Sequence, residues 1–315
     1  MARYVDALTS ATLKNLREQW WDSEFSGFLQ ETLRPRPGNR ILDVGCGHGT
    51  AEMGLGRLRV SQLALFAIDR NLERVAQAAA EGRSHNYRLH LAGADVTHLP
   101  FTTGAFDATF CVAVLQHVHD VPGAVRELAR VTRTGGRVLA VEPDNAARYW
   151  YSSSPLGAQA FAEASRFFSA VRTVRGDSTE PAVGPRVSAI FATCGIQPVS
   201  VQLFPVSVTH IGRPPATLWQ ARQQAVDCAL RDIADPSVVT QGRDYLRTLA
   251  RYEDDASAAG ANFVEIQNTM LFATVGQRTD AMVDTHDARV ISQRSAATSL
   301  TVSSTDRRRS FQGAR

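Results

Sequence analysis

The chain has 315 residues, of which 44% are apolar and 21% are charged, and its formal net charge is +3. This composition is typical of a soluble globular protein that is long enough to bury a full core. No apolar run reaches the roughly 20 residues of a membrane-spanning helix, and the N-terminus lacks a basic-then-apolar signal, so we expect neither a membrane span nor secretion. Residues 277–315 hold seven arginines and four aspartates, which account for the whole net charge. The remainder is neutral, which argues against nucleic acid as a partner.

The four cysteines, Cys46, Cys111, Cys194 and Cys228, have no metal-ligand spacing. Cysteines of this kind are typical of reduced thiols. We therefore expect a cytoplasmic protein without a bound metal, in which Cys46 and Cys111 are buried.

Residues 1–37 are predicted to form an N-terminal helical cover. Apolar side chains recur at helical spacing over residues 7–33, in two successive segments. Pro35, Pro37 and Gly38 then end the helical pattern.

From residue 38 to residue 143, short apolar strands alternate with helices. The expected strands are 40–44, 63–69, 87–92, 108–114 and 137–142, and the expected helices are 49–58, 71–81 and 122–131. This alternation predicts an α/β fold with a doubly wound, mostly parallel sheet that is covered on both faces. The near-continuous apolar strands fit burial on both faces.

Beyond Pro143 the alternation breaks. We expect helical insertions at about 146–176 and 214–259, a sheet-packing helix over 185–194, and closing strands over 199–208 and 269–275. These additions predict a Rossmann-like, seven-stranded sheet with helical lid insertions, all within one domain of residues 38–278. Residues 279–315 are rich in Ser, Thr and Arg and are predicted to be a disordered tail.

The segment Ile41–Thr50 reads ILDVGCGHGT, an apolar strand that runs into Gly45, Gly47 and Gly49. Glycine allows φ > 0 and a close approach of a ligand to the backbone. The spacing is G-x-G-x-G rather than the G-x-G-x-x-G of dinucleotide enzymes, and no Walker lysine follows. A phosphate-cradling P-loop is therefore excluded.

Polar side chains follow five successive strands, where a doubly wound sheet binds its ligands. These residues are Asp43, Asp69, Asp95, Gln116, His117, His119, Asp120, Glu142, Asp144 and Asn145. Asp69 lies 20 residues after Gly49, a position suited to a ribose diol, with a helix N-cap as the alternative. For Asp95 the alternative to ligand binding is an Asx-turn before Leu99.

Five segments in order, LDVGCGHG, AIDRN, AGADVTHLPF, FDATFCVAVLQHV and RVTRTGGRVLAVEP, resemble the class I S-adenosylmethionine-dependent methyltransferases. The similar type is the small-molecule enzyme of ubiquinone and menaquinone biosynthesis, and the resemblance covers about Gly38–Pro143. It implies S-adenosyl-L-methionine as cofactor, with its ribose on Asp69, its adenine on Asp95 and its carboxylate at the glycine turn. The expected cofactor contacts are Asp43, Gly45, Cys46, Gly47, Gly49, Asp69, Arg70, Asp95, Val96, Cys111, Val112 and Gln116.

The resemblance implies methyl transfer to O, N or C of a small, largely apolar or aromatic molecule, mainly by proximity and alignment. His117 is the candidate general base, and a packed or capping histidine is the alternative. Tyr149, Trp150 and Tyr151 are candidates for the acceptor pocket, or else they attach a lid helix to the core. Other functions left open are a non-catalytic S-adenosylmethionine- or S-adenosylhomocysteine-binding protein and an NAD-dependent enzyme, which the glycine spacing disfavours. A homodimer is compatible with the sequence.

Overall fold

The computed structural model describes residues 21, 23–56, 58, 60–84, 89–177, 180 and 182–280. The first part of the predicted helical cover, residues 1–20, and the predicted tail from residue 281 onward lie outside these ranges. The division into a cover, a domain and a tail therefore stays a prediction.

Several helices begin at a local signal that the sequence carries. Asp120, Ser154 and Asp235 each precede a helix with proline in its first turn, and each side chain accepts a hydrogen bond from a backbone N–H of that turn. A polar cap satisfies one of the N–H groups that a helix start leaves unpaired, and proline lacks the N–H that would need a partner. These signals start α5 (Val121–Val131), α6 (Pro155–Val174) and α9 (Pro236–Ala259).

The described residues form a mostly parallel, eight-stranded sheet with the order β3-β2-β1-β4-β5-β8-β6, and β7 also pairs with β8. The five parallel strands are β1 (Arg40–Val44), β2 (Ala64–Asp69), β3 (Leu89–Gly93), β4 (Phe106–Val112) and β5 (Thr132–Pro143). The antiparallel strands are β6 (Tyr149–Ser152), β7 (Ile196–Ile211) and β8 (Val264–Arg278). The Rossmann-like fold class is confirmed.

The expected count of seven strands is wrong, because residues 149–152 are extended rather than helical. They form β6, in which Tyr149 pairs with Asn268 and Ser152 pairs with Glu265 of β8. Aromatic residues favour strands when a partner edge is present, and β8 supplies that edge. The helical insertion therefore begins only at Pro155.

Helices cover both faces of the parallel sheet. Side chains of α5 and α7 (Val187–Thr193) pack on one face, in a core with Leu42, Cys111 and Ala140. Side chains of α2 (Ser23–Leu33) and α3 (Thr50–Gly56) pack on the other face, against Ile41 and Leu139. The remaining elements are the helix α4 (Leu72–Ser84) and the short 3-10 turns η2 (Leu115–His117), η3 (Gly184–Arg186) and η4 (Gly260–Asn262).

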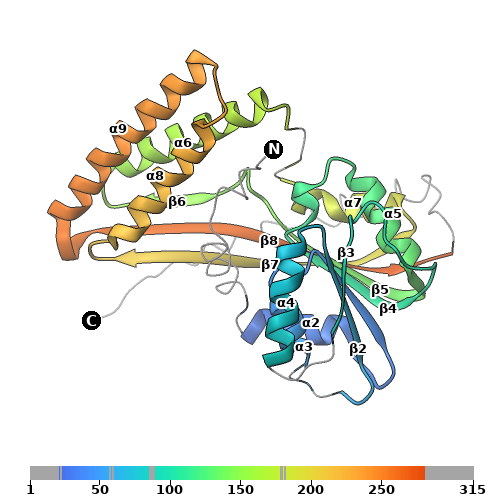
Figure 1. Cartoon of the computed structure of the whole chain (residues 1–315). Helices are drawn as coiled ribbons and strands as arrows, with labels where there is room; N and C mark the ends of the chain where they lie inside the picture. The colour runs from blue at the N-terminus through green and yellow to red at the C-terminus, as the bar shows by residue number, and fades with distance from the viewer. Residues whose placement is uncertain are drawn as a thin grey trace, which may run out of the picture.

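The β7–β8 ribbon extends past the carboxyl edge of the parallel strands (Figure 1). Leu271 of β8 pairs with Pro143, the last residue of β5, so residues 264–270 and their β7 partners continue beyond it. At about 3.3 Å per residue this extension is roughly 23 Å long. The helices α6, α8 (Ala216–Leu230) and α9 form a layer over the far part of this ribbon, with their own apolar core.

A buried ion pair joins this helical layer to the ribbon. Glu265 of β8 is fully buried, and its carboxylate accepts hydrogen bonds from Arg222 of α8 at 3.2 and 2.5 Å. The Tyr252 hydroxyl donates to the same carboxylate at 2.6 Å and lies 2.8 Å from the Ser152 hydroxyl. Since its members come from α8 and α9 on one side and from β6 and β8 on the other, the network attaches the helical layer to the sheet.

Candidate functional site

The glycine turn after β1 holds its shape through positive φ angles and contacts with two neighbouring segments. Gly45, Gly47 and Gly49 have φ values of 82°, 56° and 82°. The N–H of Gly45 donates to the carbonyl of Ile68 at 2.7 Å. A Cβ on Gly45 would lie only 2.3 Å from Cγ2 of Val114. Only glycine therefore combines this backbone conformation with the close approach of the loop after β4.

Asp69, the last residue of β2, joins the glycine turn to the start of α4. Its side chain is 6% exposed. One carboxylate oxygen accepts the N–H of Gly47 at 3.0 Å, and the other accepts the N–H of Asn71 at 2.8 Å. The side chain of Asn71, and not that of Asp69, accepts from the N–H of Glu73 inside the helix. A carboxylate has about four acceptor positions, so Asp69 retains acceptor capacity.

Asp95 follows β3 and lies on the surface. Its Oδ1 accepts hydrogen bonds from the N–H and the hydroxyl of Thr97 at 2.9 and 2.7 Å, which forms the Asx-turn that was the alternative prediction. Its Oδ2 makes no hydrogen bond within the described chain. Partial burial raises the pKa of Asp95, but the bonds from Thr97 and the charges of Arg70 and His98 outweigh this and lower it. Asp95 is therefore ionised at neutral pH, beside the buried Val96.

Three titratable groups lie together beneath the carboxyl edge of the sheet. Asp43 is 4% exposed, and Cys111 and Glu142 are fully buried. Burial, together with the negative charges of Glu142 and Asp43, raises the pKa of the Cys111 thiol well above its ordinary value. Cys111 therefore stays a neutral thiol, and Cys46 packs against Ala67, so the predicted burial of both cysteines is confirmed.

Glu142 organises the loop after β4. Its carboxylate accepts the N–H groups of Val114 and Leu115, each at 2.8 Å, and that of Gln116 at 3.3 Å. These donors begin η2, which carries His117. The sequence placed Glu142 at a strand end but assigned it no role. The signal that was available is an acid ending a buried strand beside a short polar turn.

A chain of amide contacts ties η2 to the segment after β5. The Nδ2 of Asn145 donates to Oε1 of Gln116 at 2.6 Å, and Arg148 donates to Oδ1 of Asn145 at 2.5 Å. His117 is half-buried, whereas His119 is exposed. The structure thus brings Gln116 and His117 to the same edge as Glu142, and the catalytic role of His117 stays a prediction.

The three aromatic residues of β6 do not share one environment. Trp150 packs on Phe161, with ring centroids 4.8 Å apart, and Arg222 lies over its ring. These contacts of Trp150 match the alternative prediction, in which the aromatic residue attaches a lid helix to the core. Strand alternation turns Tyr149 and Tyr151 to the opposite face, where they are 59% and 46% exposed. The three residues therefore lie on two faces of β6, and their role in an acceptor pocket stays a prediction.

The remaining expected contacts also lie at the carboxyl edge. Arg70 follows Asp69 and is exposed, and Val112 is the half-buried last residue of β4.

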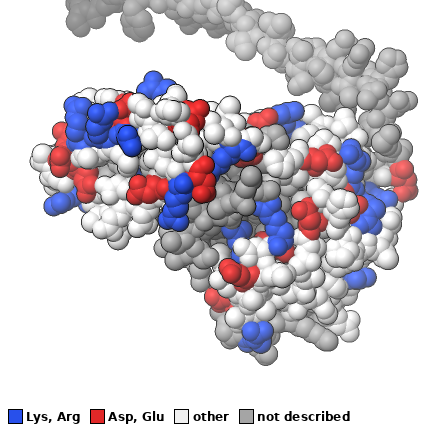
Figure 2. Space-filling view, turned by 45° about the horizontal axis from the view of Figure 1, so that its top comes forward, with Lys and Arg blue, Asp and Glu red and all other residues white. Residues whose placement is uncertain are grey.

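Within the described ranges, no group of three His, Cys, Asp or Glu residues is placed to hold a metal ion. Across those same ranges, no helix is both long and apolar enough to cross a membrane. Figure 2 shows basic and acidic side chains interspersed over the helical layer and the neighbouring part of the sheet.

The strand order defines a Rossmann-like α/β fold, and the glycine turn after β1 and the polar strand ends form a candidate ligand site at its carboxyl edge. Residues 42–140 match the family described as "Methyltransferase domain". This match agrees with the resemblance of the five motifs to the class I S-adenosylmethionine-dependent methyltransferases.

Curated relatives of this part of the chain include methyltransferases. The chain is 38% identical over 118 residues to the ubiquinone biosynthesis O-methyltransferase of Methylocella silvestris, which covers 36% of this chain and 44% of the relative. It is 27% identical over 170 residues to the 27-O-demethylrifamycin SV methyltransferase of Amycolatopsis mediterranei, covering 51% and 60%. The chain thus spans less than two thirds of the length of these relatives.

A solved structure titled as a methyltransferase from Bacillus halodurans C-125 has a TM-score of 0.52 and 14% sequence identity. The comparison covers 82% of this chain and 100% of that chain. At this identity the likeness shows the fold alone.

Proposed function

We propose that the protein transfers a methyl group from S-adenosyl-L-methionine to a small, largely apolar or aromatic molecule. The observation that carries this proposal is the buried carboxylate of Asp69 on the glycine turn, at the carboxyl edge of a methyltransferase domain. Oxygen is the favoured acceptor among O, N and C, because the matched relatives include O-methyltransferases.

The residues at this edge fit the cofactor. Asp69 keeps acceptor capacity for the ribose hydroxyls, and Oδ2 of Asp95 is available to the exocyclic amine of adenine, beside the N–H of Val96. The first turn of α3, after Gly49, presents helix N–H groups that suit a carboxylate. When bound, the cofactor supplies a methyl group that its sulfonium has already activated.

The contribution of the chain is alignment and exclusion of water. Glu142 fixes the turn that carries Gln116 and His117, and Asn145 holds the Gln116 side chain. Holding reactants in the reactive geometry accelerates a displacement by several powers of ten. We propose that His117 accepts the proton of an acceptor hydroxyl, since an imidazole titrates in the required pH range.

The proposal includes a small-molecule partner, no nucleic acid partner, a cytoplasmic location and a homodimer as the assembly. The alternative function is a protein that binds S-adenosylmethionine or S-adenosylhomocysteine without transferring the methyl group. Cofactor affinity without methylation across a broad panel of phenols, amines and carbon acids would favour this alternative.

The central experiment measures cofactor affinity by calorimetry in Asp69→Asn. We expect S-adenosylmethionine to bind at least about tenfold more weakly, because the amide offers fewer acceptor positions and no charge. Asp235→Asn, which changes a remote helix cap in the same chemical way, should bind within about twofold of the parent protein. An unchanged affinity in Asp69→Asn would refute the site assignment.

A second measurement separates binding from catalysis. His117→Gln should keep the cofactor affinity and lower kcat by about a hundredfold if His117 is the base. An unchanged kcat would remove His117 from the mechanism and leave alignment alone. A thermal shift with NAD and none with S-adenosylmethionine would contradict the proposal as a whole.

A further inference from the structure

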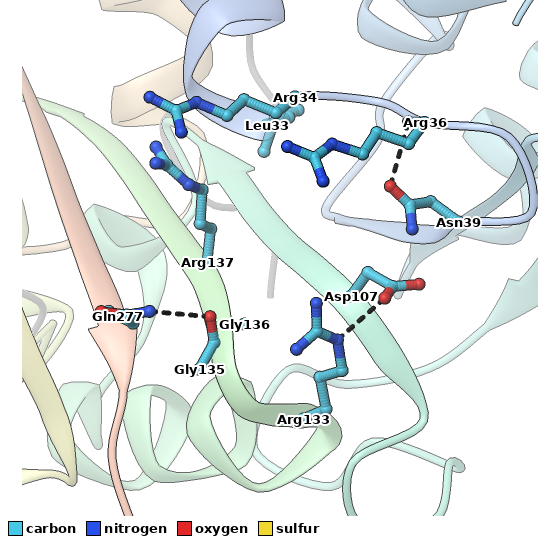
Figure 3. Close-up of a pocket in the computed structure, with 10 residues that line it drawn as sticks. All are labelled: Leu33, Arg34, Arg36, Asn39, Asp107, Arg133, Gly135, Gly136, Arg137 and Gln277. Atoms are coloured by element: carbon cyan, nitrogen blue, oxygen red, sulfur yellow. Dashed lines mark hydrogen bonds and ion pairs between the residues drawn. The ribbon is translucent and has the colours of Figure 1, made fainter.

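A cavity of ≈ 300 Å³ lies at the amino edge of the parallel sheet, opposite the glycine turn. Its walls come from the segment between α2 and β1, the start of β4 and the start of β5. Figure 3 shows four arginines around one space: Arg34 and Arg137 lie beside each other, and Arg36 and Arg133 extend toward them. The cavity is therefore lined by guanidinium groups from two sides.

Among the described residues that line this cavity, Asp107 is the single acid, and it is already engaged. Asp107 accepts a hydrogen bond from Nε of Arg133 at 2.8 Å and another from the N–H of Arg40 at 2.9 Å. Partial burial raises the pKa of Asp107, but the bonds from Arg40 and Arg133 outweigh it and lower the pKa. Four arginines and one aspartate leave the lining with a charge of +3.

The other arginines have no acid in reach within the described chain. Arg137 is half-buried and donates to the carbonyl of Thr32 at 3.0 Å. Burial and the charge of Arg34 both lower the pKa of Arg137, so two like charges lie close together. Arginine stays protonated even when its pKa is lowered, so the cavity retains positive charge that no acid of the described chain neutralises.

The backbone around the cavity is fixed. Arg34 has a positive φ of 46° at the end of α2, a conformation that usually belongs to glycine or asparagine. A Cβ on Gly136 would lie 2.7 Å from the carbonyl oxygen of Arg133. The side chain of Gln277 donates to the carbonyl of Gly135 at 3.0 Å. The arginines therefore project from a tightly packed frame.

We propose that this cavity binds a small multivalent oxyanion of the diphosphate type, either free or carried by a small molecule. The planar guanidinium group pairs with phosphate oxygens through two parallel hydrogen bonds, and several such groups converge here. A diphosphate supplies enough negative charge to balance the lining, and the cavity is large enough for a small ligand. The site lies on the opposite edge from the methyl-transfer site and does not depend on it.

The direct test is a calorimetric titration of the full chain with inorganic pyrophosphate and with orthophosphate at low salt. Pyrophosphate should bind at least about tenfold more tightly than orthophosphate, since it can meet more guanidinium groups. The double variant R34Q/R137Q should weaken pyrophosphate binding by about tenfold or more. The matched control R243Q/R251Q removes two exposed arginines of α9 and should change the affinity by less than about twofold.

A thermal unfolding experiment gives an independent signature. Without an added anion, R34Q should melt at a higher temperature than the parent protein, because it removes the repulsion with Arg137. In saturating pyrophosphate this order should reverse, because the parent gains more from the ligand. A structural role for Arg34 would lower the melting temperature in both conditions, and that result would overturn the proposal.

Three other outcomes would also overturn it. The first is that the parent chain does not bind pyrophosphate at millimolar concentration. The second is that R243Q/R251Q loses as much pyrophosphate affinity as R34Q/R137Q. The third is that an oligonucleotide, at equal phosphate concentration, binds more tightly than pyrophosphate with the same dependence on Arg34. S-Adenosylmethionine affinity should stay within about twofold in R34Q/R137Q, because the two edges are separate. A failure at one edge can therefore be distinguished from a failure at the other.

Discussion

At the carboxyl edge of the sheet, Asp69 and Glu142 accept hydrogen bonds from backbone N–H groups of the neighbouring loops. At the amino edge, Arg34 and Arg137 lie beside each other, and Asp107 is engaged with other partners. One edge thus has buried acids whose bonds shape the loops, and the other has arginines whose charge the described chain leaves unbalanced.

This difference shows two ways in which a protein holds charged groups. A backbone N–H is fixed by the fold, so a carboxylate that collects several of them sets the loop conformation before any ligand arrives. An arginine cluster with fewer acids than arginines retains repulsion that an incoming anion relieves. Five predictions test this difference.

The largest effect is expected at Glu265, a buried acid that is paired with a side chain rather than with the backbone. Glu265→Ala leaves Arg222 with an unpaired charge and should lower the free energy of unfolding by about 3–5 kcal/mol. Urea denaturation followed by tryptophan fluorescence measures this loss, because Arg222 lies against Trp150 and Trp219. A loss below about 1 kcal/mol would contradict the assignment of this network as the attachment of the helical layer.

The same residue predicts a pH dependence. Burial raises the pKa of Glu265, but the bonds from Arg222, Tyr252 and Gln267 outweigh it and lower the pKa below its ordinary value. The stabilisation is therefore present above the unfolded carboxyl pKa of about 4.3 and is lost as the pH falls through the folded value. Glu265→Gln should flatten this acid-side decline in thermal melts, and an unchanged decline would assign it to other carboxylates.

The next effect concerns the backbone-paired acid at the carboxyl edge. Glu142→Ala leaves the N–H groups of Val114, Leu115 and Gln116 without their acceptor and should cost about 2–3 kcal/mol in urea denaturation. Glu142→Gln keeps one acceptor oxygen and should cost about half as much. Equal stability of Glu142→Ala and the parent would show that this loop does not depend on the carboxylate.

A smaller effect is expected at the glycine turn. Gly45→Ala adds a clash with Val114 to the strain of a positive φ and should cost about 2 kcal/mol. Gly38→Ala is the matched control, because Gly38 has a φ of 79° and open space around it, and it should cost about 1 kcal/mol. The double variant G45A/V114A should recover part of the loss, and no recovery would exclude the clash as its cause.

The smallest effect tests the amino edge. Asp107→Asn removes the one acid among the described residues of the cavity lining and should tighten pyrophosphate binding by about threefold. Asp254→Asn, an exposed change on α9, should leave the affinity unchanged in the same calorimetric titration. Weaker binding in Asp107→Asn would mean that the acid positions Arg133 for the anion rather than competing with it.

Local sequence signals were sufficient for much of the fold. The helix predicted from Pro122 onward is α5 of the structure, and the apolar runs mark the five parallel strands in chain order, whereas their order in the sheet comes from the pairing. The two closing strands were predicted at their centres but are longer, because pairing between β7 and β8 continues through polar residues such as Ser207 and Asn268. β6 was missed because its strand conformation depends on the distant edge of β8.

The candidate site, like the fold, was predictable from the sequence only in part. The positions of Asp69 and Asp95 at strand ends were predictable, since parallel strands bring their carboxyl ends together. The Asx-turn predicted as the alternative for Asp95 accounts for its bond from Thr97. The bond from Gly47 to Asp69 was not predictable, because no spacing rule identifies a donor 22 residues away. The different surroundings of Trp150 and Tyr151 also follow from the pairing of β6.

The sequence by itself determined the class of the domain, since the glycine turn and the acids that follow it are local features with fixed spacing. Only the tertiary structure revealed the arginine-lined cavity at the amino edge of the sheet. Arg34, Asp107 and Arg137 are far apart in the chain, and only the pairing of β1, β4 and β5 places them around one cavity. Charges that meet through sheet pairing leave no periodic or local pattern in the sequence, and their balance depends on which acids the fold places within reach.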